Sequence, residues 1–186
     1  LAVIIITIIS VPFATVLLKL GKEEADTMSY FILSETLMLA GVFLSAWIVW
    51  HLHGFSLEGL GRSLTMRWKD WLSGILLATV LYAVEIAGVA FNPSSLLISL
   101  VFFLLVAVTE ERALRGFVLE RLLQSGVNKF CALFLSAALF SLIHIGNPNF
   151  DFLSFINILL AGILLGSSYI YTRNLCFPIA LHWFWN

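Results

Sequence analysis

The sequence predicts an all-α fold, a polytopic transmembrane helical bundle of about seven helices. Hydrophobic residues make up 61% of the 186 residues and charged residues only 11%, which is far from the balance of soluble domains. The apolar residues occur in runs of roughly 20, the length with which a helix crosses a bilayer. Stretches rich in Gly, Pro, Asn or charged residues separate these runs. We therefore expect one membrane-embedded domain over residues 1–186, with its motif-bearing core in residues 95–186.

The first half of the chain contains three expected spans. They cover residues 1–18, which Pro12 should kink, residues 29–50, which include Glu35, and residues 71–91, which include Glu85. Trp68, just before the third span, and Trp71, at its start, suit the headgroup region, where tryptophan is enriched. The chain begins at Leu1 inside an apolar run, and we interpret this beginning as a sign that the sequence is a fragment.

The second half contains three further spans and a short last helix. We expect a fourth span from the turn at residues 92–95 to Glu110, a helical continuation to Gln124, a turn at 125–128, a fifth span at 129–145, a turn at 146–149, a sixth span at 152–171 and a last helix at 175–186. Gly162 and Gly166 in the sixth span have the small-xxx-small spacing that lets another helix approach closely. The last helix is too short to span a bilayer.

Charge and cysteine content narrow the class of protein further. A net charge of −1 gives no reason to expect a nucleic-acid partner. The two cysteines, Cys131 and Cys176, indicate no disulfide framework. Basic residues gather in the second, fourth and sixth loops, which the positive-inside rule places in the cytoplasm; they are Arg62, Arg67 and Lys69, then Arg112, Arg115, Arg121 and Lys129, then Arg173.

The fourth span ends in a cluster of charges, Glu110-Glu111-x-x-x-Arg115. Ionisable groups at the end of a membrane-length apolar run indicate a functional site by default. A purely structural interpretation is also open, because Glu111 and Arg115 are four residues apart and could neutralise each other on one helical face. Arg112 could be an interfacial side chain whose charged end reaches water.

Sequence spacing brings further polar residues to this cluster. Glu110 lies 17 residues before Val127, at the tip of the turn between the fourth and fifth spans, and His144 lies 17 residues after it. Two antiparallel helices that leave this turn would therefore carry both side chains to the same depth. His182 and Asn186 are four residues apart and share one face of the last helix. We interpret Glu110, His144, His182 and Asn186 as one functional constellation.

The depth of His182 does not agree with that of the other two residues. At about 1.5 Å per residue, Glu110 and His144 lie roughly 25 Å along their helices from the turn, whereas His182 lies only about 12 Å from its own turn. Helix tilt, a hairpin that projects into the cytosol, or a break after Glu111 would each reconcile these depths, and the sequence does not choose among them.

Three ordered motifs resemble one known family. Glu110-Glu111-x-x-x-Arg115, Phe140-x-x-x-His144 and His182-x-x-x-Asn186 are similar to the motifs of the CAAX protease and bacteriocin-processing (CPBP, or Abi) family of intramembrane proteases, which includes the type II CAAX prenyl endopeptidases. The resemblance covers residues 109–186 and, more loosely, residues 54–61. Leu114 stands where aromatic residues are frequent in the family.

The resemblance implies hydrolysis of a peptide bond near the C-terminus of a prenylated or otherwise membrane-associated peptide. It also implies an integral protein of a prokaryotic plasma membrane, in contact with lipid. Glu110 with His144 could activate a water molecule, and His182 with Asn186 could donate hydrogen bonds to the developing oxyanion. Glu111 and Arg115 would hold the helix that contains them in place around these residues.

A zinc-dependent version of this chemistry is also open. Its ligands would be His144, His182 and Glu110, with water in the fourth position. The sequence has no His-Glu-x-x-His element, and asparagine is a poor zinc ligand, so we favour water activation without a metal.

A second function class remains open from the residues alone. Buried Glu and His side chains also form proton relays, so the chain could be a proton-coupled carrier, a non-catalytic membrane scaffold or an immunity protein. Glu35 and Glu85 favour this alternative because the peptidase interpretation gives them no role. The sequence shows no internal repeat and no pair of interrupted spans, which carriers often have.

Overall fold

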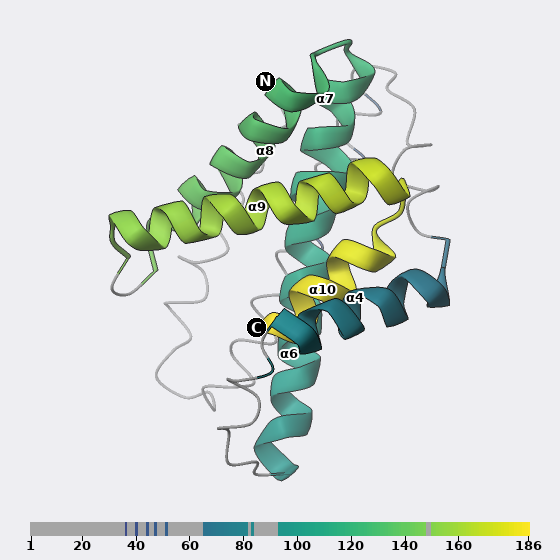
Figure 1. The fold of residues 1–186 in the computed structure, drawn as a ribbon, viewed down its shortest axis with the longest axis vertical. Coiled ribbons are helices and arrows are strands. Elements are labelled where there is room, and N and C mark those ends of the chain that lie inside the picture. Colours follow the sequence, from purple (N-terminus) through teal and green to yellow (C-terminus); the bar gives the residue numbers. More distant parts are fainter. Residues whose placement is uncertain are drawn as a thin grey trace.

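The computed structural model describes residues 65–81, 83, 93–147 and 150–186, together with residues 36, 40, 44, 47 and 51. Every regular element in these ranges is a helix (Figure 1). In chain order they are α4 (Trp68–Leu81), α6 (Pro93–Glu111), the π-helix η1 (Arg112–Leu119), α7 (Glu120–Gln124), α8 (Lys129–Ile143), α9 (Phe152–Thr172) and α10 (Cys176–Trp185). The expected first span, most of the second, Glu35 and Glu85 lie outside the described residues, so the count of seven helices stays a prediction.

Turn residues set the helix boundaries in the second half of the chain. The expected fourth, fifth and sixth spans correspond to α6, α8 and α9 with ends that differ by one or two residues. Asn128 caps α8 by accepting a hydrogen bond from the Phe130 N–H at 2.9 Å. Asp151 caps α9 by accepting one from the Ser154 N–H at 2.7 Å, and this bond holds the pKa of the Asp151 carboxyl below its usual value. Side-chain oxygens at these positions satisfy N–H groups that have no partner inside the helix.

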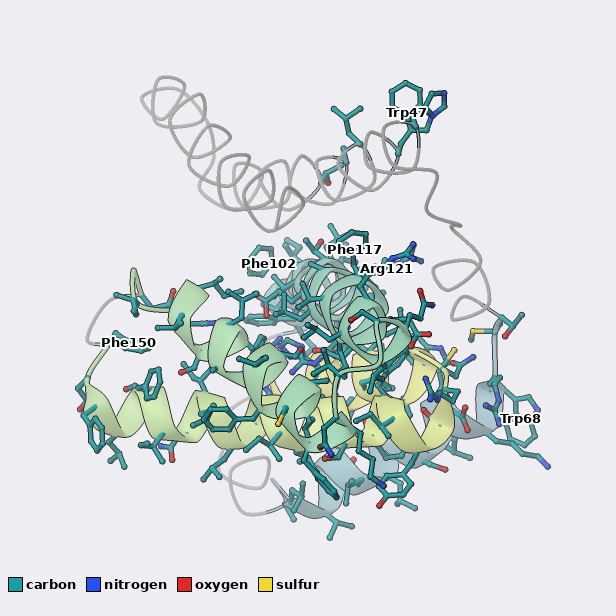
Figure 2. All side chains as sticks on the ribbon, turned by 90° about the horizontal axis from the view of Figure 1, so that it is seen from above. Trp47, Trp68, Phe102, Phe117, Arg121 and Phe150 are labelled. Carbon is teal, nitrogen blue, oxygen red and sulfur yellow. The ribbon has the colours of Figure 1, made fainter. Side chains whose placement is uncertain are left out.

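The third expected span begins earlier than its apolar run. We expected it to start at Trp71, but α4 starts at Trp68, since the Arg67 carbonyl already accepts bonds from the N–H groups of Asp70 and Trp71. Trp68 is 64% exposed and points away from the neighbouring helices (Figure 2), as an interfacial anchor would. The described part of the helix ends at Leu81, and most of the expected remainder lies outside the described residues.

Two close helix pairs, α8 with α9 and α4 with α10, organise the described part of the chain (Figure 1). A Cβ atom at Gly162 of α9 would lie 3.0 Å from both Cα and Cβ of Ala137 on α8. The Gly162 and Gly166 spacing therefore has the role that the sequence predicts. A Cβ atom at Gly74 of α4 would lie 2.7 Å from the carbonyl oxygen of Phe177 on α10. In both pairs the absence of a side chain allows the backbones to approach.

Gly162→Ala is expected to destabilise the α8–α9 pair. The added methyl group would meet backbone as well as side-chain atoms, so the helices must move apart, at a cost of about 1–3 kcal/mol. Thermal unfolding in detergent would measure this loss. Gly146→Ala is the matched control, because a Cβ atom there has nothing within 4 Å. Equal unfolding temperatures for the two variants would contradict the close packing.

The outer surface of these helices fits a lipid environment. Among the described helices, α9 is long and apolar enough to cross a membrane, whereas the apolar helix α8 is shorter. Large apolar side chains on both helices are more than half exposed, among them Phe130, Phe134, Phe152, Leu153 and Leu160. An apolar surface of this extent is rare in water-soluble monomers. We interpret it as the lipid-facing side of the bundle.

Directly after Glu111 the helix changes from α to π without a break in the chain. Figure 1 shows α6, η1 and α7 as one continuous run. Six of the eight residues of η1 are buried, including Arg115, so η1 is enclosed around most of its circumference. A π-helix bonds residue i to i+5 and is wider than an α-helix, so it advances less per residue. This change shortens the path from the Val127 turn to Glu110 and leaves the path from that turn to His144 unchanged.

A buried side chain, that of Asn174, fixes the turn between α9 and α10. Asn174 is 1% exposed; its Nδ2 donates to the Thr65 carbonyl at 2.9 Å, and its Oδ1 accepts from the Cys176 N–H at 2.7 Å. The guanidinium of Arg67 donates to the Thr172 carbonyl at 2.9 Å. These bonds tie the start of α10 to the segment before α4 and thereby set the position of His182.

Candidate active site

Five of the six residues that the sequence singled out come together between α6, η1, α8 and α10. Glu110 and Glu111 end α6, Arg115 lies in η1, His144 is the residue that follows α8, and His182 lies in α10. The side chains of Glu110 and His144 are each 19% exposed, whereas those of Glu111 and Arg115 are fully buried. Glu110 and His144 are therefore the more exposed pair of the cluster.

The carboxylate of Glu110 faces the ring of His144, as their equal distance from the Val127 turn predicts. Glu110 Oε1 lies 3.8 Å from His144 Nε2. His144 Nδ1 lies 2.7 Å from the Phe140 carbonyl oxygen, which can only accept, so Nδ1 has the proton and the Nε2 lone pair of the neutral ring faces Glu110. The Oε1–Nε2 distance is too long for a hydrogen bond, but it lies within reach of one bridging water molecule.

His182 is held on the other side of Glu110 by the second glutamate. Its Nδ1 lies 2.8 Å from Glu111 Oε1, and its Nε2 lies 3.7 Å from Glu110 Oε2. Because a carboxylate accepts hydrogen bonds, the His182 proton is on Nδ1 and the Nε2 lone pair of the neutral ring faces Glu110. The Nε2 atoms of His144 and His182 thus both face the carboxylate of Glu110. The side chain of His182 is 4% exposed, so its ring is almost completely enclosed.

Glu111 also forms a buried ion pair with Arg115. Arg115 Nη1 donates to Glu111 Oε1 at 2.7 Å, and Nη2 donates to the Gly162 carbonyl of α9 at 3.2 Å. The expected i,i+4 ion pair is therefore present, and the same carboxylate oxygen also contacts His182. Glu111 consequently links η1, α10 and, through Arg115, α9.

Some buried polar atoms of this cluster have no hydrogen-bond partner among the described residues. They include Oε2 of Glu110, Oε2 of Glu111 and Nε of Arg115. Buried polar atoms are normally paired, and an exception calls for an explanation such as a catalytic role or bound water. Glu110 Oε2 is the atom that faces His182, so one oxygen of Glu110 accepts no hydrogen bond from a described residue.

Asn186 is the one predicted site residue that the structure does not bring into the cluster. It lies at the exposed end of α10, one turn after His182, and its backbone N–H donates to the His182 carbonyl at 3.3 Å. Among the described residues, no hydrogen bond joins its side chain to Glu110, His144 or His182. Its expected role as an oxyanion donor remains a prediction.

The donor atoms of Glu110, His144 and His182 are of the types that zinc prefers. Their nearest nitrogen–oxygen separations are 3.7 and 3.8 Å. In the part of the chain that the structure describes, no group of three His, Cys, Asp or Glu side chains has the arrangement needed to hold a metal ion. We therefore derive no chemical step through a zinc ion.

Phe140 lies beside the site residues, but its place in the motif did not predict a role for its side chain. It belongs to the Phe140-x-x-x-His144 motif, and its ring lies against Arg115, His144 and His182. A sequence signal was available, since residues four apart on a helix share a face. The Gly162 carbonyl was also missed, and no sequence pattern identifies a backbone acceptor on a distant helix.

The comparison with protein families gives one match for this chain. A family described as "Type II CAAX prenyl endopeptidase Rce1-like" matches residues 92–186. The chain belongs to this family. The matched residues include the whole cluster around Glu110 and all three motifs. Rce1-like proteins are peptidases integral to the membrane, which agrees with the exposed apolar faces of α8 and α9. No curated protein and no solved structure matches the chain.

Proposed function

We propose that this protein is an intramembrane endopeptidase that hydrolyses a peptide bond near the C-terminus of a prenylated or otherwise membrane-associated peptide. The observation that supports this proposal best is the pair of acceptor atoms, Glu110 Oε1 and His144 Nε2, that face each other at 3.8 Å. A general base must lie within hydrogen-bond reach of a water molecule. Two acceptors at this separation, each partly exposed, suit that requirement.

In the proposed reaction, one water molecule lies between Glu110 and His144. It would donate one hydrogen to the Glu110 carboxylate and the other to His144 Nε2, so an oxygen lone pair would be free to attack the scissile carbonyl. Glu110 would take the proton during the attack and later deliver it to the leaving amine nitrogen. The Phe140 carbonyl supports this role of His144, because it fixes the proton on Nδ1.

Stabilisation of the oxyanion would fall to His182 and Asn186, and the geometry sets a condition for His182. Its Nδ1–H already donates to Glu111, so its Nε2 can donate to an oxyanion only if the ring is protonated on both nitrogens.

The proposal includes an orientation in the membrane. We propose that the basic residues Arg121, Lys129 and Arg173 face the cytoplasm of a prokaryotic cell, because basic loops are retained on that side; Arg115, expected in the same loop, is buried in the site. The carrier and scaffold alternatives depend on Glu35 and Glu85, which lie outside the described residues. A cleavage assay separates these alternatives from the peptidase.

The direct test is incubation of the purified protein with a prenylated CAAX peptide and with the same peptide unprenylated, each with and without a chelator. We expect cleavage of the prenylated peptide at a bond near its C-terminus, with no loss in chelator. Cleavage of both peptides would retain the peptidase and remove the lipid requirement. If neither peptide nor any membrane-protein tail is cut by folded protein, the proposed function is wrong.

Asn186→Ala is expected to lower kcat by about a hundredfold with little change in KM, the scale seen when one oxyanion donor is removed. If Asn186 only terminates α10, thermal stability should fall instead, with catalysis per folded molecule intact. His182→Ala should give the same kcat signature in the oxyanion scheme. Stoichiometric zinc in the wild type that disappears in His182→Ala would overturn the metal-free proposal.

A further inference from the structure

Phe140 lies among the site residues, although the proposed chemistry gives its side chain no task. The side chain is 2% exposed and lies one helical turn before His144. Its ring centroid is 4.8 Å from that of His144, with an interplanar angle of 66°, and 5.8 Å from that of His182, with an angle of 88°. Aromatic rings favour such edge arrangements. One ring thus contacts both histidines whose Nε2 atoms face Glu110.

The Phe140 ring also covers the buried cation of the site. The guanidinium carbon of Arg115 lies 4.4 Å from the ring centroid, within the range of a cation–π interaction, which is stronger where water is excluded. Arg115 is fully buried and donates to Glu111 and to the Gly162 carbonyl. The ring and these two acceptors together determine where the positive charge lies.

The position of that charge matters because two carboxylates compete for it. Glu110 and Glu111 are adjacent in the sequence, and at low dielectric a guanidinium attracts either of them strongly. A general base must keep its affinity for a proton, and a direct ion pair with a cation reduces that affinity. The proposed reaction therefore requires Arg115 to stay on Glu111 and away from Glu110.

We propose that Phe140 is the positioning residue that meets this requirement: its ring holds Arg115 against Glu111 and fixes the two imidazoles around Glu110. The ring acts through Arg115, His144 and His182, and it need not touch the substrate. This assignment rests on the proposed peptidase function for its kinetic consequences, whereas the arrangement of the histidine rings can be measured without any substrate.

The kinetic test compares two changes at position 140. Phe140→Leu, which removes the ring, should lower kcat by about a hundredfold, the scale for a small misplacement of catalytic groups, with KM within about twofold. Replacement of Phe140 by 3,4,5-trifluorophenylalanine keeps the ring shape but weakens its attraction for a cation, so kcat should fall by about tenfold. The same two replacements at Phe134, which is on α8 and 55% exposed, should leave kcat unchanged.

The substrate-free test uses nitrogen-15 spectra of protein labelled at histidine. In the wild type, neutral His144 should show its proton on Nδ1, and the resonances of His144 and His182 should both change in Phe140→Leu but not in Phe134→Leu. If Phe140→Leu does not fold, the trifluorophenylalanine protein supplies both measurements. A wild type that cleaves no peptide would refute the proposed function and leave this test intact. Unchanged histidine resonances, or wild-type kcat in the trifluorophenylalanine protein, would overturn the role of Phe140.

Discussion

Glu110→Gln is expected to abolish peptide cleavage, with kcat lowered by on the order of 10³-fold, as befits loss of a general base. Glutamine has nearly the same shape as glutamate, so water and substrate can still bind. Its amide cannot take a proton from the water molecule that faces His144. His144→Ala should cause a comparable loss, because Nε2 is the second acceptor for that water. The kcat of each variant is measured with the peptide that the wild type cleaves.

The same substitution should leave the protein as stable as the wild type, or more so. Glu110 Oε2 is buried without a hydrogen-bond partner among the described residues, so removal of the charge relieves a desolvation cost. Glu120→Gln, at a carboxylate in α7 that pairs with the exposed Arg173, is the control and should retain full activity. Near wild-type turnover by Glu110→Gln would show that the base is assigned wrongly. Loss of folding in parallel with activity would make Glu110 a structural residue.

The contact between Glu110 and His144 could be predicted because one local feature determines it. Ser125, Gly126 and Asn128 mark a tight turn, and Gly126 has the positive φ of 80° that glycine favours. Once the turn is located, equal counts of 17 residues on each side bring two antiparallel helices into register. The ends of α6, α8 and α9 could be predicted for the same reason, since the turn residues between the apolar runs are strong local signals.

The relation between Glu111 and His182 could not be predicted, because it depends on packing at long range. These residues are 71 positions apart, and their contact requires α10 to lie beside α6. One contact that holds the two helices together is the hydrogen bond from Trp183 Nε1 of α10 to the Leu100 carbonyl of α6 at 2.8 Å. The change to a π-helix after Glu111 was not predicted either; the sequence left open a break at this point, whereas the helix continues. Residues 112–119 include Gly116 but no proline, and an amphipathic stripe alone does not distinguish a π-helix from an α-helix.

Glu111→Gln is expected to destabilise the fold, in contrast to the same change at the preceding residue. The amide oxygen can still accept from Arg115 and His182, but the guanidinium loses its negative partner while it remains fully buried. Removal of one partner of a buried ion pair costs about 3–5 kcal/mol. For a chain of this length, that loss corresponds to a fall of roughly 10 °C in unfolding temperature. Thermal unfolding in detergent measures it, with Glu120→Gln as a control that should change little.

A double substitution separates the structural role of Glu111 from its role toward His182. Glu111→Met with Arg115→Met removes both charges and keeps apolar volume, and such replacements of buried ion pairs are often neutral or stabilising. Stability should therefore return toward the wild-type value. Activity should stay low, because His182 Nδ1 has lost the carboxylate at 2.8 Å that orients its ring. Recovery of kcat together with stability would show instead that Glu111 serves only to neutralise Arg115. In that case His182 would keep its orientation through Phe140 and Trp185, whose rings it also contacts.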